Sequence, residues 1–326
     1  MSFLVIFPLN IIMNSSSNST DDSNAYLAYA MAVEIPFIVF GNLLVLIAVF
    51  GFKHMRTNTN ILVATLALND FLIGAVSVPL MIYIYLLIIP LTSTNPVFYN
   101  WLWVIPNIFS ILAIFFVLLI TVERFVAIAY PMKLKIIFSR TKLIIYIIII
   151  VIVISFWCML LGIGFIWGIN LVSNVPYNYV TIFGFYIVPL VIIIGLYCST
   201  LQKLRNYQQE ILTHSSSNKQ SNLSVEKLNK AELKLTISLS IVIVFLILAY
   251  VPNAIWWAMS YYVNSFGMNI FSLVSNILQV SNSLVNFFIY AIKLPQFKKC
   301  FVQILRCRQT PPKSIYSTTI TAVTLA

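Results

Sequence analysis

The sequence predicts an all-α membrane protein, a bundle of seven transmembrane helices followed by an amphipathic helix. Its composition is the first reason. Of 326 residues, 61% are hydrophobic and only 8% are charged, whereas a soluble domain carries about 25% charged residues. The second reason is spacing, because the apolar residues gather in seven segments. Each is long enough to cross a hydrocarbon layer roughly 30 Å thick, which takes about 20 residues of helix.

The seven apolar segments are predicted to be helices because no backbone amide can stay unpaired in lipid. The predicted spans are 27–51, 58–88, 102–129, 143–167, 179–203, 231–259 and 267–292. A polar segment, 1–26, precedes them, and the whole of 27–292 is expected to form one transmembrane domain.

The placement of the 19 lysines and arginines predicts the orientation. They lie in the connections after the first, third, fifth and seventh spans or in the span ends that border those connections, and none falls in the N-terminal segment or in the three opposite loops. By the positive-inside rule the basic side is cytoplasmic, so the N-terminus is expected outside the plasma membrane and the C-terminus inside. Asn14 and Asn18 begin Asn-x-Ser/Thr sequons and are predicted glycosylation sites, with chance occurrence in a Ser/Asn-rich stretch as the alternative.

The net charge of +11 does not predict a nucleic-acid partner. The basic residues are spread between apolar spans, and there is no soluble basic domain to hold a duplex. The lipid bilayer is the partner that the composition predicts.

The cytoplasmic side has three further predicted segments. The third cytoplasmic loop covers about 204–230, and a helical pattern from Val225 predicts that the sixth helix extends below the membrane. An amphipathic helix at 293–308 is expected along the inner leaflet, because apolar residues recur there every three or four positions. The tail, 309–326, is rich in Thr, Ser and Pro and is predicted to be disordered. Cys307 is a candidate palmitoylation site, with Cys300 as a weaker one.

Polar residues within the spans are costly in lipid and so require a reason. Asp70 lies well inside the second span. On the seventh span, polar residues recur in steps of three and four and therefore share one face. We expect a polar core that shares waters or a sodium ion and rearranges during switching, and interhelical hydrogen bonding alone is the alternative. Its candidate residues are Asn42, Asp70, Asn282 and Asn286.

Seven landmarks stand in order along the spans. They are Gly41-Asn42, Asp70 after Leu-Ala-Leu-Asn, Glu123-Arg124-Phe125, Trp157, Pro189 with Tyr197, Pro252, and Asn286 to Tyr290. Each is weak alone, but together they resemble the rhodopsin-like, class A, G-protein-coupled receptors over the chain as far as Phe297. The resemblance implies a receptor that transmits an extracellular ligand signal to heterotrimeric G proteins by opening of helix 6. It also implies arrestin as a further partner and no cofactor beyond a sodium ion near Asp70.

The resemblance implies a switch at the cytoplasmic end. Arg124 would be held in the resting state by Glu123 or Glu232 and would engage the G protein once helix 6 moves outward. Tyr197 and Tyr290 would then move inward and stabilise the open form.

The chain also departs from the family pattern. Tyr250 replaces the tryptophan that usually precedes the proline of helix 6, here Pro252, which is expected to kink the helix. The motif on helix 7 has Phe287 in place of its proline. The cysteine expected at the outer end of helix 3 is replaced near Tyr99, so no disulfide is expected on the outer face.

The ligand is predicted to be a neutral small molecule or a peptide. Pro106 lies where aminergic members have their aspartate, and Val280 where opsins have their lysine. Glu34, a carboxylate in the outer half, is interpreted as a helix-end residue that meets water, or alternatively as an anchor for a cation. The candidate ligand contacts are otherwise aromatic and neutral, although such residues also form interfacial belts. They are Trp103, Asn107, Tyr186, Trp256 and Gln279.

Other classes of function are less well supported by the residues. An enzyme is disfavoured because the only histidines, His54 and His214, lie in cytoplasmic loops and no nucleophile–base set is evident. A transporter or channel that uses Asp70 remains an alternative, as does a receptor-like protein that no longer signals.

Overall fold

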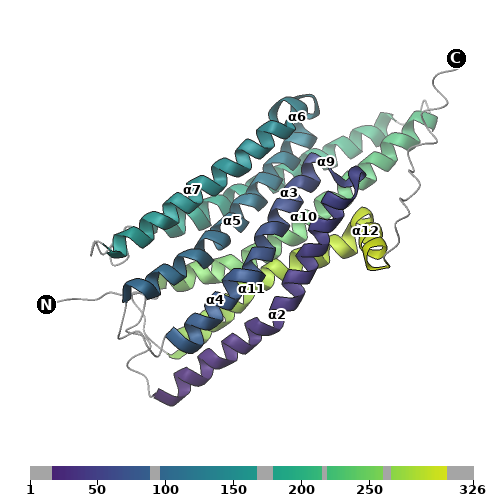
Figure 1. Cartoon of the computed structure of the whole chain (residues 1–326). Coiled ribbons are helices and arrows are strands. Elements are labelled where there is room, and N and C mark those ends of the chain that lie inside the picture. Colours follow the sequence, from purple (N-terminus) through teal and green to yellow (C-terminus); the bar gives the residue numbers. More distant parts are fainter. Residues whose placement is uncertain (1–16, 89–95, 167–178, 215–218, 260–265, 307–326) are drawn as a thin grey trace.

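The computed structural model describes residues 17–88, 96–166, 179–214, 219–259 and 266–306, and these residues are almost entirely helical, with no β-strand among them. Figure 1 shows the long helices lying side by side in one bundle, with α12 turned away at one end. The helices are α2 (Ser17–Gly51), α3 (Asn58–Leu72), α4 (Val78–Tyr83), α5 (Pro96–Ala129), α6 (Pro131–Ile137), α7 (Arg140–Ile166), α9 (Val188–His214), α10 (Lys219–Met259), α11 (Phe266–Lys293) and α12 (Pro295–Leu305). The short helical segments are η1 (Lys53–Met55), η2 (Ile73–Ser77), η3 (Ile84–Ile88) and η5 (Ile182–Ile187).

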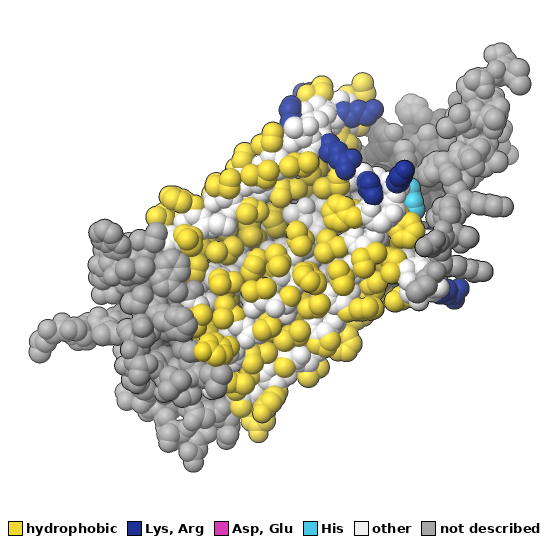
Figure 2. Space-filling view, viewed as in Figure 1, with side chains coloured by type: hydrophobic (Ala, Val, Ile, Leu, Met, Phe, Trp, Pro, Cys, Tyr) yellow, Lys and Arg dark blue, Asp and Glu magenta, His cyan; other side chains and the backbone are white. Residues whose placement is uncertain are grey.

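Six stretches of the described residues are long and apolar enough to cross a membrane. A seventh candidate span is the pair formed by Val274–Lys293 of α11 and by α12, which is bent by 98°. The apolar side chains cover the outside of the bundle, as Figure 2 shows, because lipid rather than water surrounds the helices. The predicted all-α fold class is therefore confirmed.

Two of the spans contain a widened turn directly before a proline. The π-helical segment η2 precedes Pro79, the second residue of α4, and the π-helical segment η5 precedes Pro189, the second residue of α9. A proline has no amide hydrogen and its ring crowds the preceding turn, so the turn opens. Pro252 differs, because it lies inside the uninterrupted helix α10.

The connection between the fifth and sixth spans is more helical than its polar composition predicts. The fifth span continues as α9 to His214, and α10 already begins at Lys219. Lys, Gln, Glu and Leu make up 12 of the 27 residues in 204–230, and all four are good helix formers. The predicted helical extension before the sixth span therefore starts earlier than Val225.

The centre of the bundle is α5, which packs against α3, α7, α9 and α10. The main hydrophobic cluster follows its length, from Val104 through Ile111 and Phe116 to Val126. The helices α2 and α7 lie at opposite edges of the view in Figure 1.

The amphipathic helix α12 docks on protein. Phe297, Cys300 and Phe301 are buried in a second cluster with the C-terminal half of α2, Met55 and the end of α11. Leu305, at the far end of α12, is exposed. The apolar face predicted to lie in the inner leaflet is thus mostly covered by α2 and α11, and its last turn is left uncovered.

Candidate functional site

A buried ion pair lies at the end of α5 near α6. Arg124 donates from Nε to Glu123 Oε2 at 2.6 Å and from Nη2 to Glu123 Oε1 at 2.7 Å. Glu123 is 1% exposed and Arg124 is 8% exposed. A charged pair this well covered is held by hydrogen bonds because an unpaired charge at such a site would be costly.

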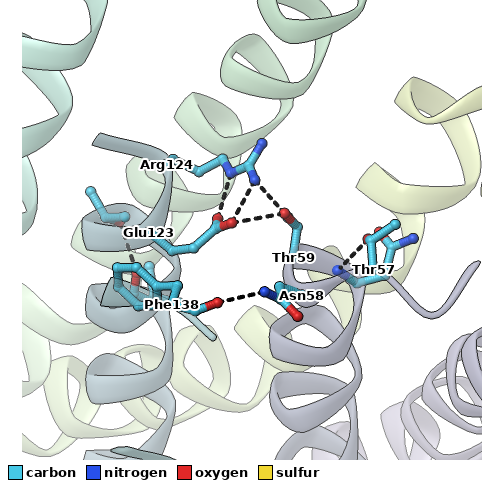
Figure 3. Close-up of polar contacts among 9 residues, drawn as sticks. Thr57, Asn58, Thr59, Glu123, Arg124 and Phe138 are labelled. Atoms are coloured by element: carbon cyan, nitrogen blue, oxygen red, sulfur yellow. Dashed lines mark hydrogen bonds and ion pairs between the residues drawn. The ribbon is translucent and has the colours of Figure 1, made fainter. Parts of the chain in front are cut away.

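A third residue, on the neighbouring helix α3, hydrogen-bonds with both members of this ion pair. Thr59 donates its hydroxyl to Glu123 Oε1 at 3.0 Å and accepts a hydrogen bond from Arg124 Nη2, as Figure 3 shows. Thr59 was not predicted, because spacing within one helix does not reveal which residue of another helix lies opposite. We refer to Thr59, Glu123 and Arg124 as the arginine cluster.

The start of α3 holds Thr59 in place. Thr57 caps the helix by accepting a hydrogen bond from the backbone N–H of Asn60 at 3.2 Å. Asn58 donates to the carbonyl of Phe138 at 2.6 Å, and this carbonyl lies just after α6 (Figure 3). The first turn of α3 therefore connects the arginine cluster to the segment between α6 and α7.

The proposed second partner of Arg124, Glu232, lies in α10, but its side chain is outside the described residues. Its pairing with Arg124 remains a prediction. Helix α5 supplies a carboxylate, from Glu123, and helix α3 supplies a hydroxyl, from Thr59, to hold the guanidinium.

The predicted polar core brings together α2, α3 and α11. Asn286 donates from Nδ2 to Asp70 Oδ2 at 2.9 Å, and Asn42 donates to the carbonyl of Ser283 at 3.1 Å. Asp70 and Asn42 are fully buried, and Asn282 and Asn286 nearly so. In the polar core, four buried oxygen atoms have no hydrogen-bond donor among the described residues, namely Asn42 Oδ1, Asp70 Oδ1, Asn282 Oδ1 and Asn286 Oδ1.

A second polar network lies further along the same face of α11, towards the end of the bundle opposite α12. Gln279 donates to Ser110 Oγ of α5 at 2.7 Å. Asn276 accepts from Asn253 of α10 at 3.3 Å and donates to the hydroxyl of Tyr85 at 3.2 Å. Every group in this network is neutral. Of its members only Gln279 was a predicted ligand contact, and the partners on other helices were missed.

The other predicted ligand contacts are distributed over several helices. Asn107 donates to the carbonyl of Trp103 at 2.8 Å, so that its amide is bonded within α5. Trp103 also contacts Tyr85 edge to face, with ring centroids 5.8 Å apart. Through these contacts Trp103 and Asn107 of α5 are connected to Tyr85 of the second polar network.

Two aromatic candidates lie away from that network. Tyr186 is buried, and its ring centroid is 6.1 Å from that of Tyr250. Trp256 contacts its neighbour Trp257 at 5.5 Å. Tyr250, the replacement for the usual tryptophan, is thus part of the main core.

The two switch tyrosines lie in different hydrophobic clusters. Tyr197 packs against the main cluster around α5. Tyr290 is buried in the cluster beneath α12 and stacks on Phe297, with ring centroids 5.7 Å apart. The Tyr290 hydroxyl has no hydrogen-bond partner among the described residues. An inward movement of both tyrosines would therefore require α11 to repack against α12.

Glu34 is not at a helix end, so that interpretation was wrong. It lies inside α2 and accepts a hydrogen bond from the hydroxyl of Ser281 on α11 at 2.7 Å. It is near the middle of this 35-residue helix, Ser17–Gly51, and within the candidate span Ala25–Gly51.

Some predicted modification sites cannot be located. Asn14 and Cys307 lie outside the described residues, and so does the side chain of Asn18 at the start of α2. Their glycosylation and palmitoylation remain predictions. Cys300 is described and is buried against α2 and α11.

Comparison with known proteins identifies a family pattern over most of the chain. Residues 41–290 match the family described as 7 transmembrane receptor (rhodopsin family). Both the arginine cluster and the polar core fall within this match.

Individual relatives are similar at a lower level. The 5-hydroxytryptamine receptor 2C of Rattus norvegicus is 26% identical over 260 residues, which cover 69% of this chain and 52% of that protein. The thyrotropin-releasing hormone receptor of Bos taurus is 27% identical over 318 residues, or 84% of this chain and 76% of that protein. The chain thus spans about half the length of the first relative and about three quarters of the second.

Proposed function

Because the chain belongs to the rhodopsin family of seven-transmembrane receptors, we propose that it carries an extracellular ligand signal across the plasma membrane to a heterotrimeric G protein. The N-terminus lies outside and the C-terminus inside, in keeping with the side that holds the 19 basic residues. Arrestin is a further cytoplasmic partner in this proposal, and no enzyme activity is part of it.

The arginine cluster is the observation that supports this proposal most strongly. Arg124 is buried at the cytoplasmic end of the bundle, and its guanidinium is held by Glu123 and Thr59. A buried charge held by a few bonds can have two stable arrangements, one with internal partners and one with an external partner. In the proposal, the closed state keeps Arg124 on Glu123 and Thr59, and the open state offers it to the G protein.

A surface beside the cluster suits a protein partner. Met132, at the start of α6, is 89% exposed, and α6 follows α5 after Tyr130 alone. Exposed methionines are adaptable contacts at protein interfaces. We assign Met132 to the G-protein contact together with the released Arg124.

The ligand is proposed to be neutral, either a small molecule or a peptide. The hydrogen-bonding network at the outer end consists of amides and hydroxyls from Tyr85, Ser110, Asn253, Asn276 and Gln279. Such groups orient a ligand through hydrogen bonds without selecting its charge. The relatives named as 5-hydroxytryptamine receptors do not fix the ligand, because the apolar Pro106 stands where the resemblance places the aspartate of aminergic receptors.

The polar core has oxygen atoms that suit a sodium ion or ordered waters. Asp70 is an oxygen ligand with negative charge, and three asparagine oxygens around it also have no described donor. Hard cations prefer such oxygen ligands. In the proposal Asp70 and Asn286 hold the ion in the closed state and lose it when α11 moves.

The test is G-protein activation in cells, with wild type, Arg124→Ala and Glu232→Ala at matched surface expression. The proposal expects a basal or ligand-stimulated signal that Arg124→Ala abolishes and Glu232→Ala raises. Silence of all three proteins across several G-protein classes and candidate ligands would contradict it, and would favour a receptor-like protein that no longer signals. A flux that depends on Asp70 without a G-protein response would favour a transporter.

A further inference from the structure

Exposed cations gather where α6, α7 and α9 reach the cytoplasmic end of the bundle. We call this surface the basic corner. It comprises Lys133, Lys135, Arg140, Lys142 and Lys203, all with exposed side chains. Figure 2 shows Lys and Arg side chains beyond the end of the apolar surface in the region where Figure 1 places α6, with no Asp or Glu side chain visible there among the described residues.

Two of these cations converge on one aromatic ring. The Nζ atom of Lys133 lies 5.7 Å from the centroid of the Tyr130 ring, and that of Lys203 lies 5.8 Å from the same centroid. Tyr130 is itself 47% exposed. Like charges brought together repel each other, so a bound anion would stabilise this arrangement.

The nearby carboxylates do not supply that anion. Among the described side chains, Glu123 is committed to Arg124 and Thr59, and Glu34 and Asp70 lie within the membrane-spanning parts of α2 and α3. None of the described carboxylate side chains therefore serves as a counterion to the basic corner, and an anion from its surroundings would fill that place.

The depth of the basic corner indicates what those surroundings are. Ile144 and Ile145 of α7 are already exposed apolar residues, and they lie within about one helical turn of Arg140 and Lys142. Ile136 of α6 is 67% exposed beside the same cations. Cations that border exposed apolar side chains so closely lie at the level of lipid headgroups.

We propose that the basic corner binds the phosphorylated headgroup of an acidic phospholipid in the cytoplasmic leaflet. Lys133 and Lys203, whose Nζ atoms lie 5.7 Å and 5.8 Å from the Tyr130 ring centroid, contact the phosphate, and Lys135, Arg140 and Lys142 add to the attraction. Ile136 contacts the adjoining acyl chain. The binding is independent of whether the receptor couples to a G protein, so it can succeed or fail separately from the proposed function.

The experiment measures lipid binding to the full chain purified in detergent micelles. A phosphatidylinositol bisphosphate is titrated, and the fraction of protein with bound lipid is followed by native mass spectrometry. The test variant is Lys133→Gln/Lys203→Gln. The matched control is Lys298→Gln/Lys299→Gln, which removes two exposed lysines from α12 at the same end of the bundle.

The proposal predicts an apparent Kd raised about fivefold for each lysine removed from the basic corner, and so about 25-fold for the pair. The control pair should change it by less than about twofold, and Lys133→Arg/Lys203→Arg should retain binding. Thermal unfolding of each variant checks that the fold is intact.

Two results would overturn the proposal. One is an equal loss of binding for the two double variants, which would mean diffuse attraction to the whole cytoplasmic face. The other is a soluble inositol trisphosphate that competes as strongly as the intact lipid, because the apolar border would then contribute nothing and the site would be one for free phosphates.

Discussion

Replacing Thr59 by valine removes one hydroxyl from the arginine cluster and hardly changes the size of the side chain. The hydroxyl makes two hydrogen bonds, one to Glu123 Oε1 at 3.0 Å and one from Arg124 Nη2. The ion pair between Arg124 and Glu123 stays possible in the variant. The substitution therefore weakens the closed state without removing either charge.

The size of the effect follows from the two lost bonds. A hydrogen bond to a charged group contributes about 1.5–3 kcal/mol. Arg124 finds other partners in the open state, so only part of this energy distinguishes the two states. A difference of about 1.4 kcal/mol changes the ratio of open to closed receptor roughly tenfold. An open fraction of about 1% would then rise to roughly 10%.

The assay is basal G-protein activation in cells at matched surface expression. Thr65→Val is the matched control, because Thr65 also lies on α3 but donates only to the carbonyl of Ile61 at 3.0 Å within the helix. Thr59→Ser should behave like wild type because it keeps the hydroxyl. The reasoning would be refuted if Thr59→Val signalled no more than the Thr65→Val control.

Three further predictions concern the rest of the molecule. Asp70→Asn should abolish any effect of sodium on basal signalling or agonist affinity, since the negative ligand is lost; a sodium response that persists would contradict the proposed ion site. Gly41→Ala should lower the free energy of unfolding by about 1–3 kcal/mol, because its Cβ would lie 2.6 Å from Phe287 Cγ. Thermal unfolding in detergent measures this, with Gly195→Ala, which has nothing within 4 Å, expected to be neutral or stabilising. Burial raises the pKa of the Cys300 thiol to about 11, so the thiol should stay unmodified by iodoacetamide at pH 7.5 and react increasingly as the pH approaches that value, because only the thiolate attacks. Rapid modification of Cys300 in the folded protein at pH 7.5 would mean that α12 does not stay docked.

The helices could be predicted because lipid imposes a simple rule on the sequence. In a membrane a long apolar segment satisfies its backbone amides by forming a helix, and the seven segments could be located from the distribution of apolar residues along the sequence. The polar stripe on α11 was also visible, since its residues repeat with the period of one helix. Asp70 and Asn286 do form a hydrogen bond.

Contacts between helices were much harder to predict. Thr59, Ser110 and Asn253 each complete a polar site from a second helix, and nothing in their own helix distinguishes them from neighbouring polar residues. The register between packed helices depends on the shapes of many side chains at once. The docking of α12 on α2 was missed for the same reason, because an amphipathic pattern predicts that a face is covered but does not predict what covers it.

The most direct test of the receptor account combines two substitutions. Thr59→Val should raise basal G-protein activation, and adding Arg124→Ala to that variant should remove the increase completely at equal surface expression. This result would mean that the arginine released from Thr59 and Glu123 is the group that couples to the G protein. If the double variant signalled as strongly as Thr59→Val alone, Arg124 would not be the coupling residue and the central claim would be wrong.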